Sequence, residues 1–255
     1  MPSSSARIEH ATGLTAEELD TVVRALRART QTKRRRGRPW ARCLRERVQV
    51  ICMSLRTNLT LREIAGICGM SKSQVHRIIE HLTPRLAALL PHVVHDHDRR
   101  QTWIVDGTLV PTRDHSSAAK SKNYRWSCNA QVLIRGADLR VVAVVAGGPG
   151  NRNDTVHYRG SRLQAICQFH RRVLADGGYR GVPELQTPVF RKNRIVRDAK
   201  WRRHRKRRAR VEHAIARLKD WRVLRDHRRR GRHLNDAFNA VAFLHNLRIQ
   251  LRDNS

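Results

Sequence analysis

No stretch of the sequence approaches the roughly 18 consecutive apolar residues that a membrane-spanning helix requires, and no hydrophobic signal segment opens it. Amphipathic stretches with a clean lipid-facing side are lacking as well. These absences argue against a membrane partner, and we expect a cytoplasmic protein.

Cysteine is scarce and scattered. The five cysteines are odd in number, lie far apart and form no C-x-x-C pair, which excludes both a disulfide framework and a zinc ribbon. We expect them to be small buried hydrophobic side chains. No G-x-S-x-G element is present, so nothing supports a serine hydrolase.

Acidic residues are few compared with basic ones. The chain has 255 residues, with 53 lysines and arginines against 21 aspartates and glutamates, a formal net charge of +32. This charge exceeds what solubility requires and favours a nucleic acid as partner. Because the basic residues are spread along the whole chain, we expect folded surfaces, and not only a tail, to face phosphates.

The length allows a catalytic domain and a smaller module, and we expect three regions. Residues 1–40 would form an N-terminal helix and a basic arm, residues 41–98 a helical DNA-binding domain, and residues 99–255 a catalytic domain. Thr15 and Glu18 have the spacing of a capping box, which predicts a helix that ends near Arg29.

The segment from Leu61 to Ile79 has the sequence form of a helix-turn-helix. Ala65 is small where two helices would approach, Gly69 lies at the turn, and Ser71 is a natural N-cap for the second helix. An ordinary helical hairpin is the alternative. In a helix-turn-helix, the residues that point outward from the start of the second helix would contact DNA: Lys72, Ser73, Gln74 and Arg77.

Upstream, the residues Arg36-Gly-Arg-Pro39 have the form of an AT-hook core, in which Arg36 and Arg38 would enter a narrow minor groove. A solvated basic linker explains the same four residues equally well.

Short runs of β-branched residues begin after Thr102 and predict strands over 103–106, 131–134 and 140–145. The first strands have no helix between them, so they should start an antiparallel sheet, with a hairpin turn at 135–138. A helix from Asp154 to about His170 and a buried strand over 172–175 should follow. The remaining sequence is expected to be almost entirely helical.

Two aspartates lie at the ends of predicted strands. Asp106 precedes Gly107, and Asp176 precedes Gly177, so each carboxylate can project without crowding. Two such aspartates suit a pair of divalent metal ions about 4 Å apart. One more carboxylate would complete such a site.

Glu212 provides that carboxylate from an amphipathic helix. At about 100° per residue, Arg208, Glu212 and Lys219 lie along one edge of the apolar face, where a metal ligand would be flanked by two phosphate contacts. Other polar residues are expected to have structural roles: Asp154, Glu184 and Asp220 as surface charges or salt bridges, and His245 as a hydrogen-bonded core histidine.

From about Leu14 to Leu251 the sequence resembles the DDE transposases of bacterial insertion sequences, in the group named after insertion sequence five. The resemblance is strongest at 103–108, 149–154, 174–181 and 208–219. One departure is visible, since many relatives carry a tyrosine where this chain has Arg205.

The resemblance implies an α/β fold: an RNase H-like mixed sheet with flanking helices, preceded by a small all-α helix-turn-helix domain. It assigns catalysis and metal binding to Asp106, Asp176 and Glu212, and a role beside the glutamate to Arg208 and Lys219. Two Mg²⁺ ions, replaceable by Mn²⁺, would activate water for cleavage of a phosphodiester and then position the new 3′-hydroxyl for strand transfer. The partners would be the transposon ends and target DNA, bound by a homodimer near the bacterial nucleoid, without a small-molecule cofactor.

Two other functions fit the same residues. A transcriptional regulator would keep the helix-turn-helix and have no activity, and an RNase H-like nuclease would cut DNA without joining it.

Overall fold

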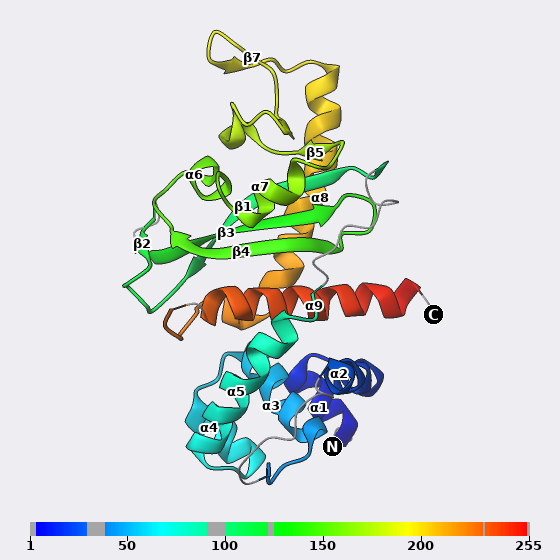
Figure 1. Cartoon of the computed structure of the whole chain (residues 1–255), viewed down its shortest axis with the longest axis vertical. Helices are drawn as coiled ribbons and strands as arrows, with labels where there is room; N and C mark the ends of the chain where they lie inside the picture. The colour runs from blue at the N-terminus through cyan, green and yellow to red at the C-terminus, as the bar shows by residue number, and fades with distance from the viewer. Residues whose placement is uncertain (1–3, 30–38, 91–99, 122–124, 232, 254–255) are drawn as a thin grey trace.

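The computed structural model describes the chain except for residues 1–3, 30–38, 91–99, 122–124, 232 and 254–255. A helical part is followed by a mixed α/β part in which helices flank a mixed sheet (Figure 1). No helix in these described ranges is long and apolar enough to cross a membrane.

The helical part begins one helix earlier than the sequence predicts. Four of its helices start with reciprocal capping boxes, in which the N-cap side chain and the third residue satisfy each other's backbone donors; the N-caps are Thr15, Cys43, Thr60 and Ser71. The box of Thr15 and Glu18 and the end of its helix at Arg29 confirm the prediction. The helices are α1 (Ser4–Thr12), α2 (Ala16–Arg29), α3 (Leu44–Thr57), α4 (Leu61–Cys68) and α5 (Lys72–Ala87).

Two of the cysteines differ from the expectation that all are buried. Cys52, Cys128 and Cys167 are buried, whereas Cys68 is only partly covered and Cys43 is exposed. Cys43 has a different role, since its sulfur accepts a hydrogen bond from the backbone N–H of Glu46 at the start of α3.

The central sheet combines antiparallel and parallel pairing. β1 (Trp103–Pro111) pairs antiparallel with β3 (Trp126–Arg135), and β3 pairs antiparallel with β4 (Val141–Pro149) and with the short β2 (Ala119–Lys120). On its other side β1 pairs parallel with β5 (Val173–Leu174), which pairs parallel with β6 (Leu185–Gln186). The predicted antiparallel start and its hairpin are therefore confirmed.

The structure corrects two other expectations for this part. The predicted helix from Asp154 is broken into α6 (Asp154–Tyr158) and α7 (Arg162–Cys167), and Gly160 between them has a φ of 70°, which no helix can accommodate. The chain after residue 175 is not all helical either. Besides β6, it contains the 3-10 helix η2 (Gly177–Tyr179) and a hairpin of β7 (Phe190–Arg191) and β8 (Arg194–Ile195).

Alternation along the strands gives the sheet two apolar faces. On β1, Ile104 belongs to the core on the side of the last two helices, and Val105 belongs to the core under α6 and α7. The last two long helices are α8 (Ala199–Lys219), which crosses β1 and β3, and α9 (His233–Asp253), which packs on β4. The 3-10 helix η3 (Arg222–Leu224) joins them.

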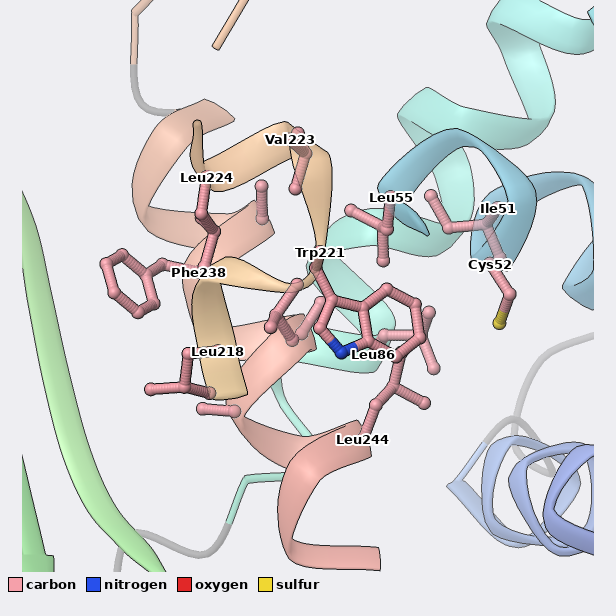
Figure 2. Close-up of a cluster of buried hydrophobic side chains, with 14 of the residues drawn as sticks. Ile51, Cys52, Leu55, Leu86, Leu218, Trp221, Val223, Leu224, Phe238 and Leu244 are labelled. Carbon is pink, nitrogen blue, oxygen red and sulfur yellow. The ribbon is translucent and has the colours of Figure 1, made fainter. Parts of the chain in front are cut away.

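A single apolar core connects the helical part to the α/β part. In Figure 1, α9 lies between the sheet and α5. Trp221, only 1% exposed, lies in this core among side chains from α3, α5 and α9, including Leu55, Leu86 and Leu244 (Figure 2). The two parts therefore share buried surface.

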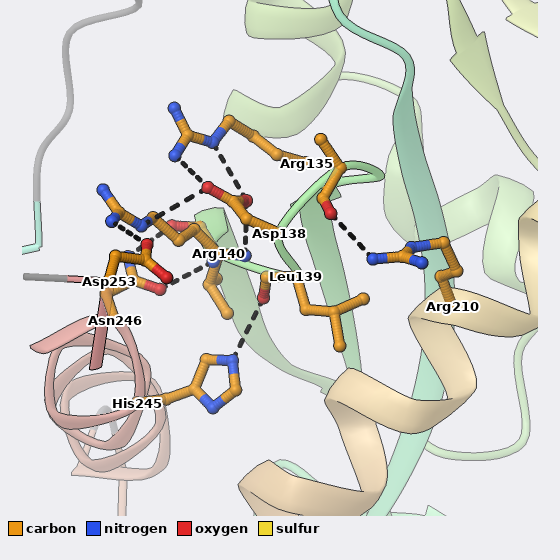
Figure 3. Close-up of polar contacts among 10 residues, drawn as sticks. Arg135, Asp138, Leu139, Arg140, Arg210, His245, Asn246 and Asp253 are labelled. Atoms are coloured by element: carbon orange, nitrogen blue, oxygen red, sulfur yellow. Dashed lines mark hydrogen bonds and ion pairs between the residues drawn. The ribbon is translucent and has the colours of Figure 1, made fainter. Parts of the chain in front are cut away.

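Polar contacts fasten α9 to the turn between β3 and β4 (Figure 3). His245, 6% exposed, contacts the carbonyl oxygen of Leu139 through Nε2 at 3.0 Å, which confirms the prediction of a hydrogen-bonded core histidine. Asn246 bonds both backbone groups of Val141, and Asp253 pairs with Arg140.

Candidate active site

The candidate site starts from Asp106 in the middle of β1. Because Asp106 is two residues after Ile104, its side chain lies on the face of the sheet that α8 covers. Its Oδ1 accepts a hydrogen bond from the backbone N–H of Gly107 at 3.0 Å, and its Oδ2 accepts one from Arg208 at 2.8 Å. The side chain is 14% exposed, so this carboxylate is largely shielded from water.

Glu212 reaches the same guanidinium from α8. It follows Arg208 by one helical turn, and Arg208 donates to its Oε1 at 2.5 Å. Arg208 thus bridges a buried carboxylate on the sheet and a carboxylate on the helix that is 57% exposed. Arg208 and Glu212 are neighbours on α8, as predicted. The arginine, which was predicted to contact a phosphate, contacts the two carboxylates in this structure.

Asp176 follows β5 by two residues. β5 runs parallel to β1 with Trp103 opposite Val173 and Ile104 opposite Leu174, and the Asp176 carboxylate comes near enough to Asp106 for its negative charge to raise the pKa of Asp106. The Oδ1 of Asp176 accepts a hydrogen bond from the backbone N–H of Gly178 at 2.8 Å. Asp176 is thus the N-cap of η2.

The electrostatics of Asp106 reflect this crowding. Its pKa is raised to about 6: burial and the negative charges of Asp176 and Asp154 raise it, and the Arg208 guanidinium and the Gly107 hydrogen bond offset part of the rise. Arg208 thus only partly offsets the cost of placing a charged carboxylate here. An additional cation at this point would stabilise the ionised form of Asp106.

Asp154 is a fourth carboxylate that the sequence interpretation left as a surface charge, and the structure corrects this. Its Oδ1 accepts hydrogen bonds from Asn129 at 2.7 Å and from Gln131 at 3.0 Å, both on β3. It lies directly against Gly107, because a Cβ on that glycine would be 2.1 Å from the same Oδ1. Asp154 is therefore enclosed beside the strand that carries Asp106.

The start of α6 also contacts the loop after Asp176. Thr155 donates to the carbonyl oxygen of Gly178, and Tyr179 donates to Gln131, whose amide binds Asp154. This polar network links both aspartate-bearing segments from the α6 side of the sheet. The sequence signal that could have singled out Asp154 is the family motif at 149–154. A single aspartate at the start of a helix does not show which strand its side chain will face.

The donor chemistry suits a hard divalent cation. Asp106, Asp176 and Glu212 offer carboxylate oxygens, the ligands that Mg²⁺ and Mn²⁺ prefer. In the described part of the chain, however, no three acidic, histidine or cysteine side chains converge closely enough to hold a metal ion. The guanidinium of Arg208 is bonded to both Asp106 and Glu212 and lies between these two carboxylates.

The residues predicted to face DNA from α5 are only partly available. Lys72, Ser73 and Arg77 are exposed at the start of the helix. Gln74 is not wholly free, because its Oε1 accepts the backbone N–H of Ser71 at 2.9 Å in the capping box. The capping bond uses the Gln74 oxygen and leaves its amide nitrogen for another partner.

Two further predicted residues have intramolecular partners. Lys219 donates to the carbonyl oxygen of Leu109 on β1 at 3.0 Å, and burial lowers its pKa. Arg205, at the position of the family's tyrosine, lies 5.5 Å from the centre of the Trp201 ring. Arg36 and Arg38 lie outside the described residues.

Residues 97–247 match the family model described as "Transposase DDE domain". Domains of this kind generally use divalent metals. Over 244 residues, 93% of this chain and 93% of the relative, the chain is 42% identical to a Streptomyces albus G protein named "Putative transposase for insertion sequence element IS112".

Proposed function

Because the chain belongs to the DDE transposase family of insertion sequences, we propose that it binds the terminal inverted repeats of such an element, cuts the DNA there and joins the freed ends to target DNA. The observation that carries this proposal is the approach of Asp176, two residues beyond β5, to Asp106 on the neighbouring strand β1, with Glu212 held to Asp106 through Arg208.

In this proposal Asp106, Asp176 and Glu212 are the catalytic carboxylates and would hold two Mg²⁺ ions, with Mn²⁺ able to replace them. When bound, such ions would lower the pKa of a water molecule and neutralise charge on the phosphoryl oxygens. Metal binding would require the ionised form of Asp106. Positive charge at this point, from Arg208 or from bound ions, would stabilise both that carboxylate and a phosphodiester placed beside it.

Arg208 would change partners during the reaction. Its guanidinium neutralises Asp106 and Glu212 while no other cation is present, and it would turn to the DNA phosphate once these carboxylates have another partner. Lys219, fixed to the Leu109 carbonyl, would hold α8 at its place along β1.

DNA recognition is proposed for α4 and α5 as a helix-turn-helix. Gly69 ends α4 with a φ of 58°, and α5 presents Lys72, Ser73 and Arg77 at its exposed start, where a recognition helix would meet base edges and phosphates. Gln74 would contribute through its amide nitrogen.

The division of labour follows the regions expected from the sequence, with 41–98 for DNA recognition and 99–255 for catalysis. An RNase H-like fold for the second region is supported by the order β4–β3–β1–β5–β6 and by its change from antiparallel to parallel pairing at β1. Two copies would hold the two ends of one element, since each chain has one set of catalytic carboxylates.

The test is cleavage of DNA that carries the inverted repeats flanking the reading frame, with Mg²⁺ or Mn²⁺ present. We expect a nick at the element's end and, when a target plasmid is added, covalent joining. Asp106→Asn should abolish both reactions and leave binding to the repeats within about twofold.

Sequence-specific binding without metal-dependent cutting would identify a regulator instead. Cutting without joining would identify a nuclease. Full activity in Asp106→Asn would refute the catalytic assignment, while Glu17→Gln on α2 is the matched surface control.

A further inference from the structure

A strongly basic segment projects beyond the edge of the sheet. Here, the basic arm is residues 190–207, which comprise the β7–β8 hairpin and the first half of α8; it is a different segment from the arm expected within residues 1–40. It contains ten lysines and arginines and a single acidic residue, Asp198. In Figure 1 it stands at the opposite end of the molecule from α4 and α5.

The charges of the basic arm are available to a partner. All ten basic side chains are exposed: Arg191, Lys192, Arg194, Arg197, Lys200, Arg202, Arg203, Arg205, Lys206 and Arg207. In the described ranges, none of them forms a salt bridge with an acidic side chain, whereas Arg208, the next residue, forms two. The arm therefore has a dense positive charge that its own fold does not neutralise.

The hairpin of the arm is fastened to the loop that follows Asp176. The guanidinium of Arg180 lies 4.8 Å from the centre of the Phe190 ring and donates to Asn193 at 3.1 Å. Phe190 also packs so closely on Gly177 that a Cβ there would be 3.0 Å from its Cζ. Whatever the hairpin binds is thus held in a set relation to Asp176.

The helical half of the arm is continuous with the helix that carries Glu212. Arg203 precedes Glu212 by nine residues within α8, about 13 Å at 1.5 Å per residue. A cavity of about 440 Å³ lies between this half and β5 and β6, beside the contact of His204 Nε2 with the Gln186 carbonyl oxygen at 3.0 Å. Its lining includes Arg172, Arg203 and Arg207. Leu174 also lines it, so the cavity opens on the face of the sheet that carries Asp106.

We propose that the basic arm binds the phosphate backbone of duplex DNA that lies beyond the bond to be cut, without reading its sequence. The position of that bond rests on the proposed function. About 13 Å corresponds to about four base pairs of B-DNA at 3.4 Å each. Long cations on all sides of one helix suit a phosphate backbone, because sequence reading requires a few side chains set into a groove.

The experiment uses the full chain and a random-sequence duplex. In the arm variant, Arg202→Gln, Arg203→Gln and Lys206→Gln remove three charges; in the control, Arg24→Gln, Arg27→Gln and Arg252→Gln remove three exposed charges from α2 and α9. Both variants have the same net charge. We expect the arm variant to bind at least tenfold more weakly near physiological salt, and the slope of log K against log salt to fall by about 2.7, or 0.9 per phosphate contact.

Equal losses in the two variants would overturn the proposal, because net charge alone would then explain binding. An unchanged affinity in the arm variant, or tighter binding of double-stranded RNA than of DNA by the unmodified chain, would overturn it as well. The hairpin variant Arg191→Gln with Arg194→Gln gives an independent reading, with an expected slope change of about 1.8.

Two further duplexes identify the source of the DNA. One ends at the cleavage position of the inverted repeat, and the other continues for fifteen base pairs. Weaker binding confined to the longer duplex assigns the arm to donor DNA, and weaker binding confined to the random duplex assigns it to target DNA. These binding measurements need no catalysis, so failure of the unmodified chain to cut DNA would count against the proposed function and leave the arm result standing.

Discussion

Arg208 and Asp106, 102 residues apart in the chain, are joined by a hydrogen bond of 2.8 Å between the guanidinium and Oδ2. The same guanidinium binds Glu212, so a side chain of this protein occupies the place between two proposed metal ligands. The protein's own cation and a divalent ion therefore compete for the same carboxylates.

This competition predicts that Arg208→Met binds Mn²⁺ more tightly than the unmodified chain, by roughly tenfold, since a charge-assisted hydrogen bond contributes about 1.5–3 kcal/mol. Titration followed by electron paramagnetic resonance measures free Mn²⁺ directly. Arg210→Met, which removes a guanidinium bound to the Ala137 carbonyl, is the control on the same helix. Unchanged or weaker Mn²⁺ binding in Arg208→Met would contradict the competition, and DNA cleavage should fall in this variant in either case.

The raised pKa of Asp106 predicts a pH-dependent stability. Because the pKa is about 6 in the fold against 3.8 for an unperturbed aspartate, ionisation is disfavoured in the folded state, and the fold loses stability as the pH rises from 3.8 to 6. Asp106→Asn removes this cost. In EDTA we expect the variant to gain on the order of 2–3 kcal/mol at pH 7.5 and almost nothing at pH 4.

Urea denaturation at the two pH values measures this difference, with Glu17→Gln as the surface control. An equal effect of Asp106→Asn at both pH values would show that packing, and not ionisation, determines its contribution.

The contact between Gly107 and Asp154 predicts coupled substitutions. Gly107→Ala places a methyl group 2.1 Å from the Asp154 carboxylate and should destabilise the protein by about 1–3 kcal/mol. Asp154→Ala leaves the Asn129 amide without its acceptor and Gln131 with only its bond to Asn129, at a similar cost.

In the double variant the shortened residue 154 no longer meets the new methyl group. The double loss should therefore be smaller than the sum of the two single losses by at least about 1 kcal/mol. Strict additivity would mean that the two residues do not touch. Gly66→Ala in α4, with no atom within 4 Å of the new Cβ, should leave stability unchanged or slightly higher.

Substitutions at Gln74 and Arg77 should separate the stability of α5 from its binding to DNA, because Gln74 caps the helix. Gln74→Ala should lower the free energy of unfolding by up to about 1 kcal/mol, because it removes half of the capping box with Ser71. Arg77→Ala should leave stability unchanged and weaken binding to the inverted repeat by about tenfold. Thermal denaturation and DNA titration measure the two effects, and a large loss of stability in Arg77→Ala would speak against an exposed DNA-facing side chain.

Much of the fold could be predicted from local pattern. Val105 and Ile104 alternate between two faces of a strand, Gly69 and Ser71 end one helix and begin the next, and these features depend only on neighbours in the chain. The short elements after Asp176 could not be predicted in this way, because two-residue strands have no periodicity to detect.

The candidate site was predictable in its members and not in its contacts. A predicted strand end singled out Asp106 and Asp176, and helical spacing singled out Glu212; the strand end is wrong for Asp106, because β1 continues to Pro111. Asp154 escaped because its partners Asn129 and Gln131 lie on another strand. The capping bond of Gln74 with Ser71 was not predicted, although a backbone N–H at a helix start needs an acceptor.

The sequence by itself determined the excess of positive charge, the helices with their caps, the strands of β-branched residues and the two aspartates that follow short apolar runs. Only the tertiary structure decided that Asp106 lies within β1 with Asp176 close to it, that Arg208 lies between Asp106 and Glu212, and that Asp154 faces Gly107. Periodicity is set by bonds between near neighbours. Register and charge pairing depend on which distant segments are packed together, and no local pattern contains that information.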